Sequence, residues 1–166
     1  MHDCSGAEVV ISDINEDALE KAAKELSCDH IMLDVTNADH WQKAIAQIKT
    51  DKGSLNILVN NAGMGGGGDV ESTDLELWNL VHKVNLDSVF MGCKYSLPLM
   101  RESGNGSIIN ISSMSGIVAS HNLAAYNSSK AAVRHLSKSV ALHCAKTTNL
   151  VRCNSIHPVF ARTDMV

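Results

Sequence analysis

The sequence lacks the features that mark membrane, secreted and nucleic-acid-binding proteins. None of its apolar runs is long enough to span a bilayer. No signal-peptide core follows Met1. Lysine and arginine number 14 against 18 aspartates and glutamates, for a net charge of −4, and no basic stripe is present. We therefore expect a protein that associates with neither membranes nor nucleic acids.

Motifs for metal binding and for serine hydrolysis are also missing. The eight histidines form no His-Glu-x-x-His motif and the cysteines no paired Cys-x-x-Cys motif, so we expect no metal site. The run Ser112-Ser113-Met-Ser115-Gly116 differs from the Gly-x-Ser-x-Gly turn of hydrolases. The five cysteines, at positions 4, 28, 93, 144 and 153, are odd in number and widely spaced. This argues against a disulfide framework and favours a reducing compartment, which we take to be the cytoplasm.

Strand-like and helix-like segments alternate along the chain. Its 166 residues have the length of one domain, and the 45% hydrophobic content can build a core. Strand-like segments cover 8–12, 30–33, 55–59, 107–112 and 150–156; helix-like segments follow Asn15, surround Trp41, and cover about 73–100 and 126–146. Strands separated by helices pair in parallel and carry helices on both faces. The sequence therefore predicts one α/β domain over residues 1–166, built on a doubly wound parallel sheet.

Tyr126 and Lys130 form the most informative pair. Four residues apart on a helix, they share one face. An ammonium beside a phenol favours the phenolate, so the phenol can serve as a general acid and base near neutral pH. Ser113 follows the 107–112 strand, at the edge where open α/β sheets bind ligands. The three residues suit proton transfer to or from an alcohol or carbonyl, although the pair alone is also common on ordinary helix surfaces.

Two aspartates end the first two strand-like segments. Asp13 can accept hydrogen bonds from an adenosine ribose and repel a 2′-phosphate. Asp34, followed by Val35, is similarly placed for the edge of an adenine ring. Either aspartate could instead only cap the helix that follows it.

Small and amide residues follow the 55–59 strand. In Asn60-Asn61-Ala62-Gly63 they would let the backbone approach a flat cofactor ring, although an ordinary turn has the same composition. Asn85 lies inside the long helical region, where asparagine is unfavourable, so it is either functional or faces solvent.

A glycine-rich run follows this segment. Gly63, Gly65 and Gly68 match Gly-x-Gly-x-x-Gly, but no helix opens there and the acid at the expected distance, Asp87, falls within a helix. We interpret this run as a mobile loop.

Taken in order, these motifs resemble the short-chain dehydrogenase/reductase family over nearly the whole chain. The matching elements are Asn60-Asn-Ala-Gly63, Asn85, Ser113, Tyr126-x-x-x-Lys130 and Asn154-Ser-Ile-His-Pro158. Residues 12–16, 87–93 and 154–158 are similar to the bacterial 3β/17β-hydroxysteroid and secondary-alcohol dehydrogenase branch. The resemblance implies a Rossmann-like fold, NAD as cofactor and an alcohol or ketone substrate, with hydroxysteroids among the candidates. It also implies a homodimer or homotetramer formed through the helices around 73–100 and 126–146.

The resemblance also implies roles for single residues. Tyr126 would donate or accept the proton, with Lys130 favouring its phenolate form and holding the nicotinamide ribose. Ser113 would hydrogen-bond the substrate oxygen. Asn85 would hold a water that links Lys130 to solvent, and Asp13 would select NAD over NADP. The remaining expected cofactor contacts are Asp34, Val35, Asn61, Ala62, Gly63 and Pro158.

The chain departs from the family pattern in three places. It begins at the equivalent of the second strand, so we expect the first strand, the glycine-rich phosphate loop and the first helix to be absent. Val159 follows Pro158 where the family usually has glycine, and the last strand and the segment that closes over substrate are absent. These departures predict an incomplete sheet and an inactive 166-residue chain. The alternative is a non-catalytic truncated homologue that retains only self-association.

Overall fold

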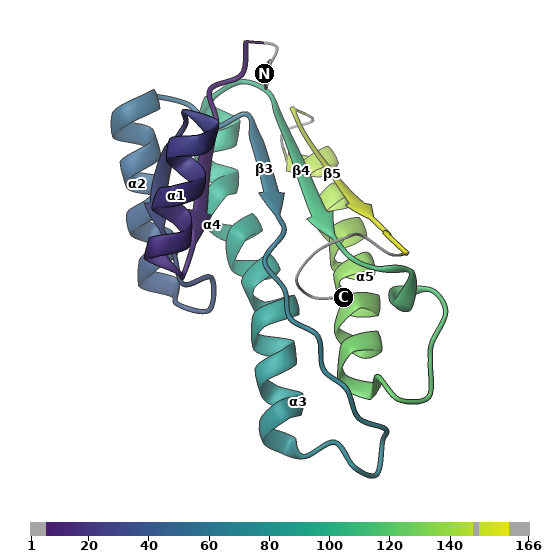
Figure 1. The fold of residues 1–166 in the computed structure, drawn as a ribbon. Helices are drawn as coiled ribbons and strands as arrows, with labels where there is room; N and C mark the ends of the chain where they lie inside the picture. The colour runs from purple at the N-terminus through teal and green to yellow at the C-terminus, as the bar shows by residue number, and fades with distance from the viewer. Residues whose placement is uncertain (1–5, 148–149, 160–166) are drawn as a thin grey trace.

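Parallel strands and helices alternate through the protein (Figure 1). The computed structural model describes residues 6–147 and 150–159. One sheet pairs β1 (Val10–Asp13) with β2 (Asp29–Met32), and the second has the order β3 (Ile57–Asn60), β4 (Gly106–Ile111), β5 (Val151–Ile156). All of these pairings are parallel. The predicted alternation and the parallel α/β fold are confirmed.

The described helices pack on both sides of the first sheet and on one side of the second. α1 (Glu16–Leu26) packs on β1 and β2, whereas α2 (Ala38–Lys52) packs against α4 (Ser88–Glu102) on the opposite side. α5 (Ala124–Thr147) packs on β4 and β5. Side chains at the predicted starts set the helix boundaries: Asn15 Oδ1 accepts from the Ala18 N–H at 3.0 Å. The doubly wound arrangement therefore follows from local signals that the sequence carries.

The long helical region predicted over 73–100 is interrupted. It consists of α3 (Leu75–His82), a π-helical turn (Lys83–Asp87) and α4. Asp74 caps α3 by accepting from the Leu77 N–H at 2.7 Å, so the helix begins at Leu75, two residues after the expected start. A π turn inserts one residue into the helical repeat and often marks a functional position. Asn85 lies at the centre of this turn.

Most of the core lies between the second sheet and the helices behind it. The buried residues of this cluster are Val89, Cys93, Leu97, Met100, Ile108, Val133, Val140, Cys144, Val151 and Cys153. A polar chain crosses it: Asn60 Nδ2 donates to Asn110 Oδ1 at 2.8 Å, and Asn110 Nδ2 donates to Ser137 Oγ at 2.9 Å. Because buried amides need partners, this chain fixes β3, β4 and α5 relative to one another. The described cysteines 28, 93, 144 and 153 are free thiols, and Cys4 lies outside the described residues.

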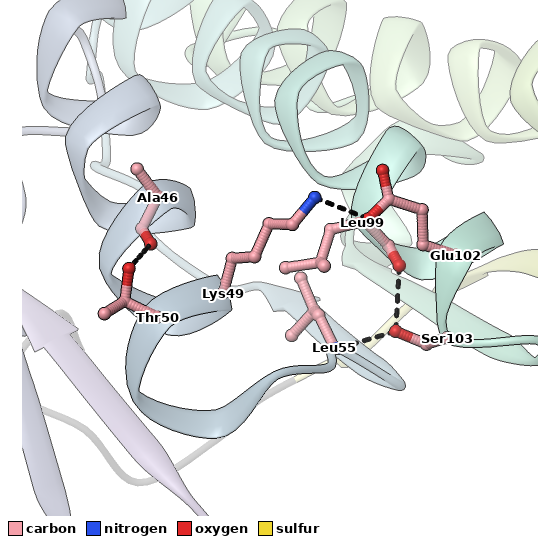
Figure 2. Close-up of polar contacts among 7 residues, drawn as sticks. All are labelled: Ala46, Lys49, Thr50, Leu55, Leu99, Glu102 and Ser103. Atoms are coloured by element: carbon pink, nitrogen blue, oxygen red, sulfur yellow. Dashed lines mark hydrogen bonds and ion pairs between the residues drawn. The ribbon is translucent and has the colours of Figure 1, made fainter.

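Figure 2 shows how the ends of α2 and α4 are joined to the start of the second sheet. Lys49 of α2 forms an ion pair of 2.6 Å with Glu102 of α4, and both side chains are more than half exposed. Ser103 Oγ accepts from the Leu55 N–H at 2.9 Å and donates to the Leu99 carbonyl at 2.8 Å. An exposed ion pair stabilises weakly, so the serine bonds hold this junction more firmly.

The two sheets are not joined by strand pairing within the described residues. β1 pairs only with β2, and β3 only with β4, in the order β2-β1 and β3-β4-β5. Both sheets nevertheless contribute to one apolar cluster, in which Leu33 and Trp41 are buried against Leu58 of β3. On the other face of β3, Ile57 and Val59 remain 57% and 50% exposed. No described helix is long and apolar enough to cross a bilayer.

Candidate active site

Several of the predicted site residues lie at or just beyond the carboxyl ends of the strands. Asn61, Ala62 and Gly63 follow β3, Ser113 follows β4 and Pro158 follows β5. Because these strands are parallel, their carboxyl ends share one edge of the sheet. Asp13 and Asp34 stand at the corresponding ends of β1 and β2, on the other sheet.

Gly63 brings two predicted catalytic residues together. A Cβ at this position would lie 3.2 Å from both Asn85 Oδ1 and Lys130 Nζ, which is tighter than ordinary contact. Glycine therefore leaves a cradle beside the lysine that a larger residue would fill. Gly63, Asn85 and Lys130 therefore lie together, although 67 residues of sequence separate Gly63 from the lysine.

Lys130 is a buried ammonium beside the predicted phenol. It is 4% exposed, and its Nζ lies 5.7 Å from the centre of the Tyr126 ring. The ammonium donates to the Ile111 carbonyl at 3.0 Å. Burial lowers the pKa of Lys130 to about 8, because removal from water penalises the charged form. The lysine still carries its positive charge near pH 7, and this charge lies beside the end of β4 and the Tyr126 ring.

Asn85 faces the site and not solvent. Its side chain is fully buried, so the solvent-facing alternative is wrong. Its Oδ1 accepts from the Met64 N–H at 2.8 Å, while Nδ2 donates to the Met64 carbonyl at 3.0 Å and to Ser129 Oγ at 3.1 Å. Ser129 in turn donates to the Tyr126 carbonyl at 2.8 Å. Asn85 thus fixes the segment after Gly63 against the helix that carries the tyrosine, and the predicted water link stays a prediction.

Ser113 is held in an extended conformation with one oxygen lone pair occupied. Its φ and ψ are −162° and 161°, and it caps the short 3₁₀ turn Met114–Gly116. The Ser113 Oγ accepts from the Ser115 N–H at 3.1 Å, and the residue is 7% exposed. With that oxygen oriented by a backbone donor, the hydroxyl hydrogen can serve a second partner.

The turn after Ser113 docks directly on α5, which sequence reasoning did not foresee. Ser112 Oγ donates to the Lys130 carbonyl at 2.8 Å. A Cβ at Gly116 would lie 2.7 Å from the same carbonyl, so only glycine permits this approach. Ser112 and Gly116 therefore set the position of Ser113 relative to Lys130, and the run of small residues at 112–116 was the available signal.

His157 is a further residue at the site without a predicted role. Its Nδ1 lies 3.1 Å from the Ser113 carbonyl and its Nε2 2.9 Å from Ser155 Oγ. The next residue, Pro158, accepts a hydrogen bond from the Met114 N–H at 2.9 Å. Pro158, expected beside the cofactor, thus supports the same turn through its carbonyl.

Both aspartates on the first sheet organise local turns. Asp13 Oδ1 accepts from the Asn15 N–H at 2.8 Å. Asp34 Oδ1 accepts from the Thr36 hydroxyl and N–H, each at 2.8 Å, and these bonds hold the pKa of Asp34 below its usual range. The capping alternatives are wrong, because Asn15 and Asn37 cap the two helices and the aspartates bond only the turns that precede them. Asp13 remains exposed. The carbonyl of Val35 accepts a hydrogen bond from the Trp41 indole N–H at 2.9 Å.

The glycine-rich run is a loop, as predicted, with one end attached to α5. The Gly68 N–H donates to the Asn122 carbonyl at 2.9 Å, and the Gly68 carbonyl accepts from the Ala124 N–H at 3.0 Å. A turn stabilised by Asp69, not a helix, follows the last glycine. The run therefore lacks the helix start that a phosphate fingerprint needs, and its mobility stays a prediction.

Comparison with known proteins identifies the class. A family model described as Enoyl-(Acyl carrier protein) reductase matches residues 3–166. Together with the parallel α/β fold, this match defines the class: a family of Rossmann-like oxidoreductases that use nicotinamide cofactors. The chain belongs to the short-chain dehydrogenase/reductase family.

Individual relatives agree with this assignment. The 3-beta-hydroxysteroid dehydrogenase of Comamonas testosteroni is 41% identical over 163 residues, covering 97% of this chain and 64% of the relative. The NADP-dependent (R)-specific alcohol dehydrogenase of Lentilactobacillus kefiri is 40% identical over 166 residues, covering 97% and 66%. A gluconate 5-dehydrogenase from Burkholderia cenocepacia J2315, solved with NADP and tartrate, is 30% identical with a TM-score of 0.89, covering 97% and 64%. The chain thus spans just under two thirds of the length of these relatives.

Proposed function

We propose that this chain carries the catalytic part of an NAD-dependent dehydrogenase that interconverts secondary alcohols and ketones, with Tyr126 as general acid and base. The observation that carries the proposal is the meeting of Gly63, Asn85 and Lys130 beside the Tyr126 ring. A buried cation next to a phenol suits proton transfer, and the lack of a side chain at Gly63 suits the approach of a flat cofactor.

In this proposal the protein moves the proton and holds the reactants. A bound nicotinamide cofactor would supply the hydride chemistry at the substrate carbon. In alcohol oxidation the Tyr126 oxygen takes the hydroxyl proton, and in ketone reduction it gives the proton back. Ser113 donates a hydrogen bond to the substrate oxygen, and the Lys130 ammonium places a positive charge beside the Tyr126 ring.

In this proposal the same residues also bind the cofactor. Lys130 would hold the nicotinamide ribose, and Asn61, Ala62 and Gly63 would flank it with little bulk. Asp13 would accept hydrogen bonds from the adenosine ribose, because its carboxylate is exposed at the end of β1 and repels a 2′-phosphate. The relatives of similar identity include an NADP-dependent enzyme, so identity alone does not decide the cofactor. The proposed preference for NAD over NADP therefore rests on Asp13.

Substrate class and assembly are proposed on separate grounds. The names of the relatives point to secondary alcohols and hydroxysteroids. Phe90 on α4 and Leu142 on α5 are 50% and 73% exposed, which supports a homodimer or homotetramer built on these helices. Sedimentation at micromolar concentration tests the assembly, and a monomer would contradict it.

The test of the proposed function uses the full-length enzyme. By this we mean residues 1–166 with the flanking segments that their gene encodes or, where it encodes none, with those of the Comamonas relative. A panel of secondary alcohols, including 3-hydroxysteroids, is incubated with NAD and formation of NADH is followed. Turnover of at least one secondary alcohol is expected; activity confined to other substrate classes would refute the proposal.

A further inference from the structure

His157 connects the end of β5 to the residue that follows β4. Its ring contacts the Ser113 carbonyl through Nδ1 at 3.1 Å and Ser155 Oγ through Nε2 at 2.9 Å. Residues 113 and 157 are 44 positions apart, and the ring is partly buried between the two segments. The imidazole is therefore held at both nitrogens, and a side chain held in this way has a defined orientation.

The chemistry of the partners assigns the hydrogen atoms of the ring. A carbonyl only accepts, so Nδ1 must carry the hydrogen that is donated to Ser113. In the neutral ring Nε2 then accepts from the Ser155 hydroxyl. Both contacts are satisfied by one tautomer of the neutral imidazole.

Backbone bonds on each side of this contact enclose Ser113. The Ser112 N–H donates to the Ile156 carbonyl and the Met114 N–H to the Pro158 carbonyl, both at 2.9 Å. Pro158 has no N–H to donate in return. Pro158 therefore cannot donate a backbone hydrogen bond to the segment around Ser113. The neighbouring His157 ring donates one instead, from Nδ1 to the Ser113 carbonyl.

We propose that His157 is a positioning residue: it orients the peptide plane of Ser113 and, through it, the hydroxyl that faces the substrate oxygen. The expected loss of kcat rests on the proposed function, whereas the orientation of Ser113 by His157 does not. Small misplacements of a reacting group lower catalytic rates by about 100-fold, whereas a side chain that only orients the substrate-binding hydroxyl leaves cofactor binding intact. Loss of the Nδ1 donor should therefore lower kcat and spare the KM for NAD.

Three substitutions of His157 distinguish the effect of its N–H donor from the effect of its aromatic ring. His157→Asn keeps an N–H near the position of Nδ1, His157→Gln moves it to the position of Nε2, and His157→Phe keeps the ring without either nitrogen. In the full-length enzyme we expect kcat to fall about 10- to 100-fold for Gln and Phe and less than about threefold for Asn. His30→Asn, at an exposed histidine on β2, is the control and should be neutral. Equal losses for Asn and Phe would overturn the proposal.

A double-mutant cycle distinguishes positioning from a general structural effect. If His157 acts through the Ser113 hydroxyl, His157→Phe should cost little further kcat once Ser113→Ala has removed that hydroxyl. Losses that multiply in the double variant would show that the histidine does not act through Ser113.

Nuclear magnetic resonance of the same protein gives a readout that needs no turnover. The ¹⁵N shifts of His157 should show hydrogen on Nδ1 and none on Nε2, and the carbonyl ¹³C shift of Ser113 should move in His157→Phe but return in His157→Asn. A ring with its hydrogen on Nε2, or an unmoved Ser113 carbonyl, would overturn the inference whether or not the enzyme is a dehydrogenase. Absence of turnover in the wild type with these shifts as expected would refute only the proposed function.

Discussion

The side chain of Asn85 and the backbone of Met64 form a reciprocal pair of hydrogen bonds, with Oδ1 accepting at 2.8 Å and Nδ2 donating at 3.0 Å. Through this pair the π turn between α3 and α4 determines where the segment after β3 lies. The third bond of Asn85, to Ser129, extends the connection to the helix of Tyr126 and Lys130. One asparagine thus joins three segments of the site.

Replacing Asn85 should destabilise the fold as well as the site. Asn85→Leu keeps the branched shape of the side chain but leaves the two Met64 groups without partners, so we expect a loss of roughly 1–3 kcal/mol in the free energy of unfolding. Urea unfolding of the full-length enzyme measures it. Asn79→Leu, at an exposed asparagine in α3, should change stability by less than about 0.5 kcal/mol. Equal effects of the two substitutions would show that the Met64 pair contributes nothing.

The burial of Lys130 predicts a pH-dependent stability. Below about pH 8 the lysine is charged in both the folded and the unfolded chain, and the full cost of burying the charge is present. As the pH rises through 8 the folded form loses its proton first, so this cost is relieved and stability rises. Lys130→Met should therefore be more stable than the wild type at pH 7 by about 1–3 kcal/mol, and the difference should shrink near pH 10.

Denaturant unfolding of the cofactor-free protein across this pH range tests the prediction. Lys138→Met, at an exposed lysine of the same helix, is the matched control and should show no such trend. A Lys130→Met difference that stays constant from pH 7 to pH 10 would mean that the lysine is not held in its buried state.

Asp13 should set the cofactor preference. We expect the full-length enzyme to have a higher kcat/KM with NAD than with NADP, and Asp13→Ala to narrow the ratio by about tenfold or more, since one lost repulsion is worth roughly 1.4 kcal/mol. Asp17→Ala removes the same charge from the first turn of α1 and should leave the ratio unchanged. Better use of NADP by the wild type would rule out the assignment.

The 166-residue chain expressed alone should be poorly ordered or prone to aggregate. β1 and β3 each have one described strand neighbour, and Ile57 and Val59 lie exposed on β3. Unpaired edges and exposed apolar strands favour association with other chains. A thermal melt beside a calorimetric titration with NAD decides the question: we expect no cooperative melt and no measurable binding. A cooperative melt with micromolar NAD affinity would show that residues 1–166 are sufficient.

The sequence predicted those parts of the structure that depend on local patterns. The cap at Asn15, the alternation of strands with helices and the i, i+4 spacing of Tyr126 and Lys130 are all encoded within a few neighbouring residues. The π turn at Asn85 was not predictable, because inserting one residue hardly changes the apolar pattern of a long helix. The contacts of Ser112, Gly116 and His157 escaped prediction for another reason: each joins segments that only the folded sheet and α5 bring together.

The most direct test of the whole account is Tyr126→Phe in the full-length enzyme, with Tyr95→Phe as control. The chain has two tyrosines, and Tyr95 packs on α4 against the Leu33 and Trp41 cluster, so the control removes the other phenolic hydroxyl. We predict that Tyr126→Phe lowers kcat by at least about 100-fold while the dissociation constant for NAD changes less than about threefold, and that Tyr95→Phe keeps wild-type turnover. Retention of most activity by Tyr126→Phe would contradict the assignment of Tyr126 as the acid and base.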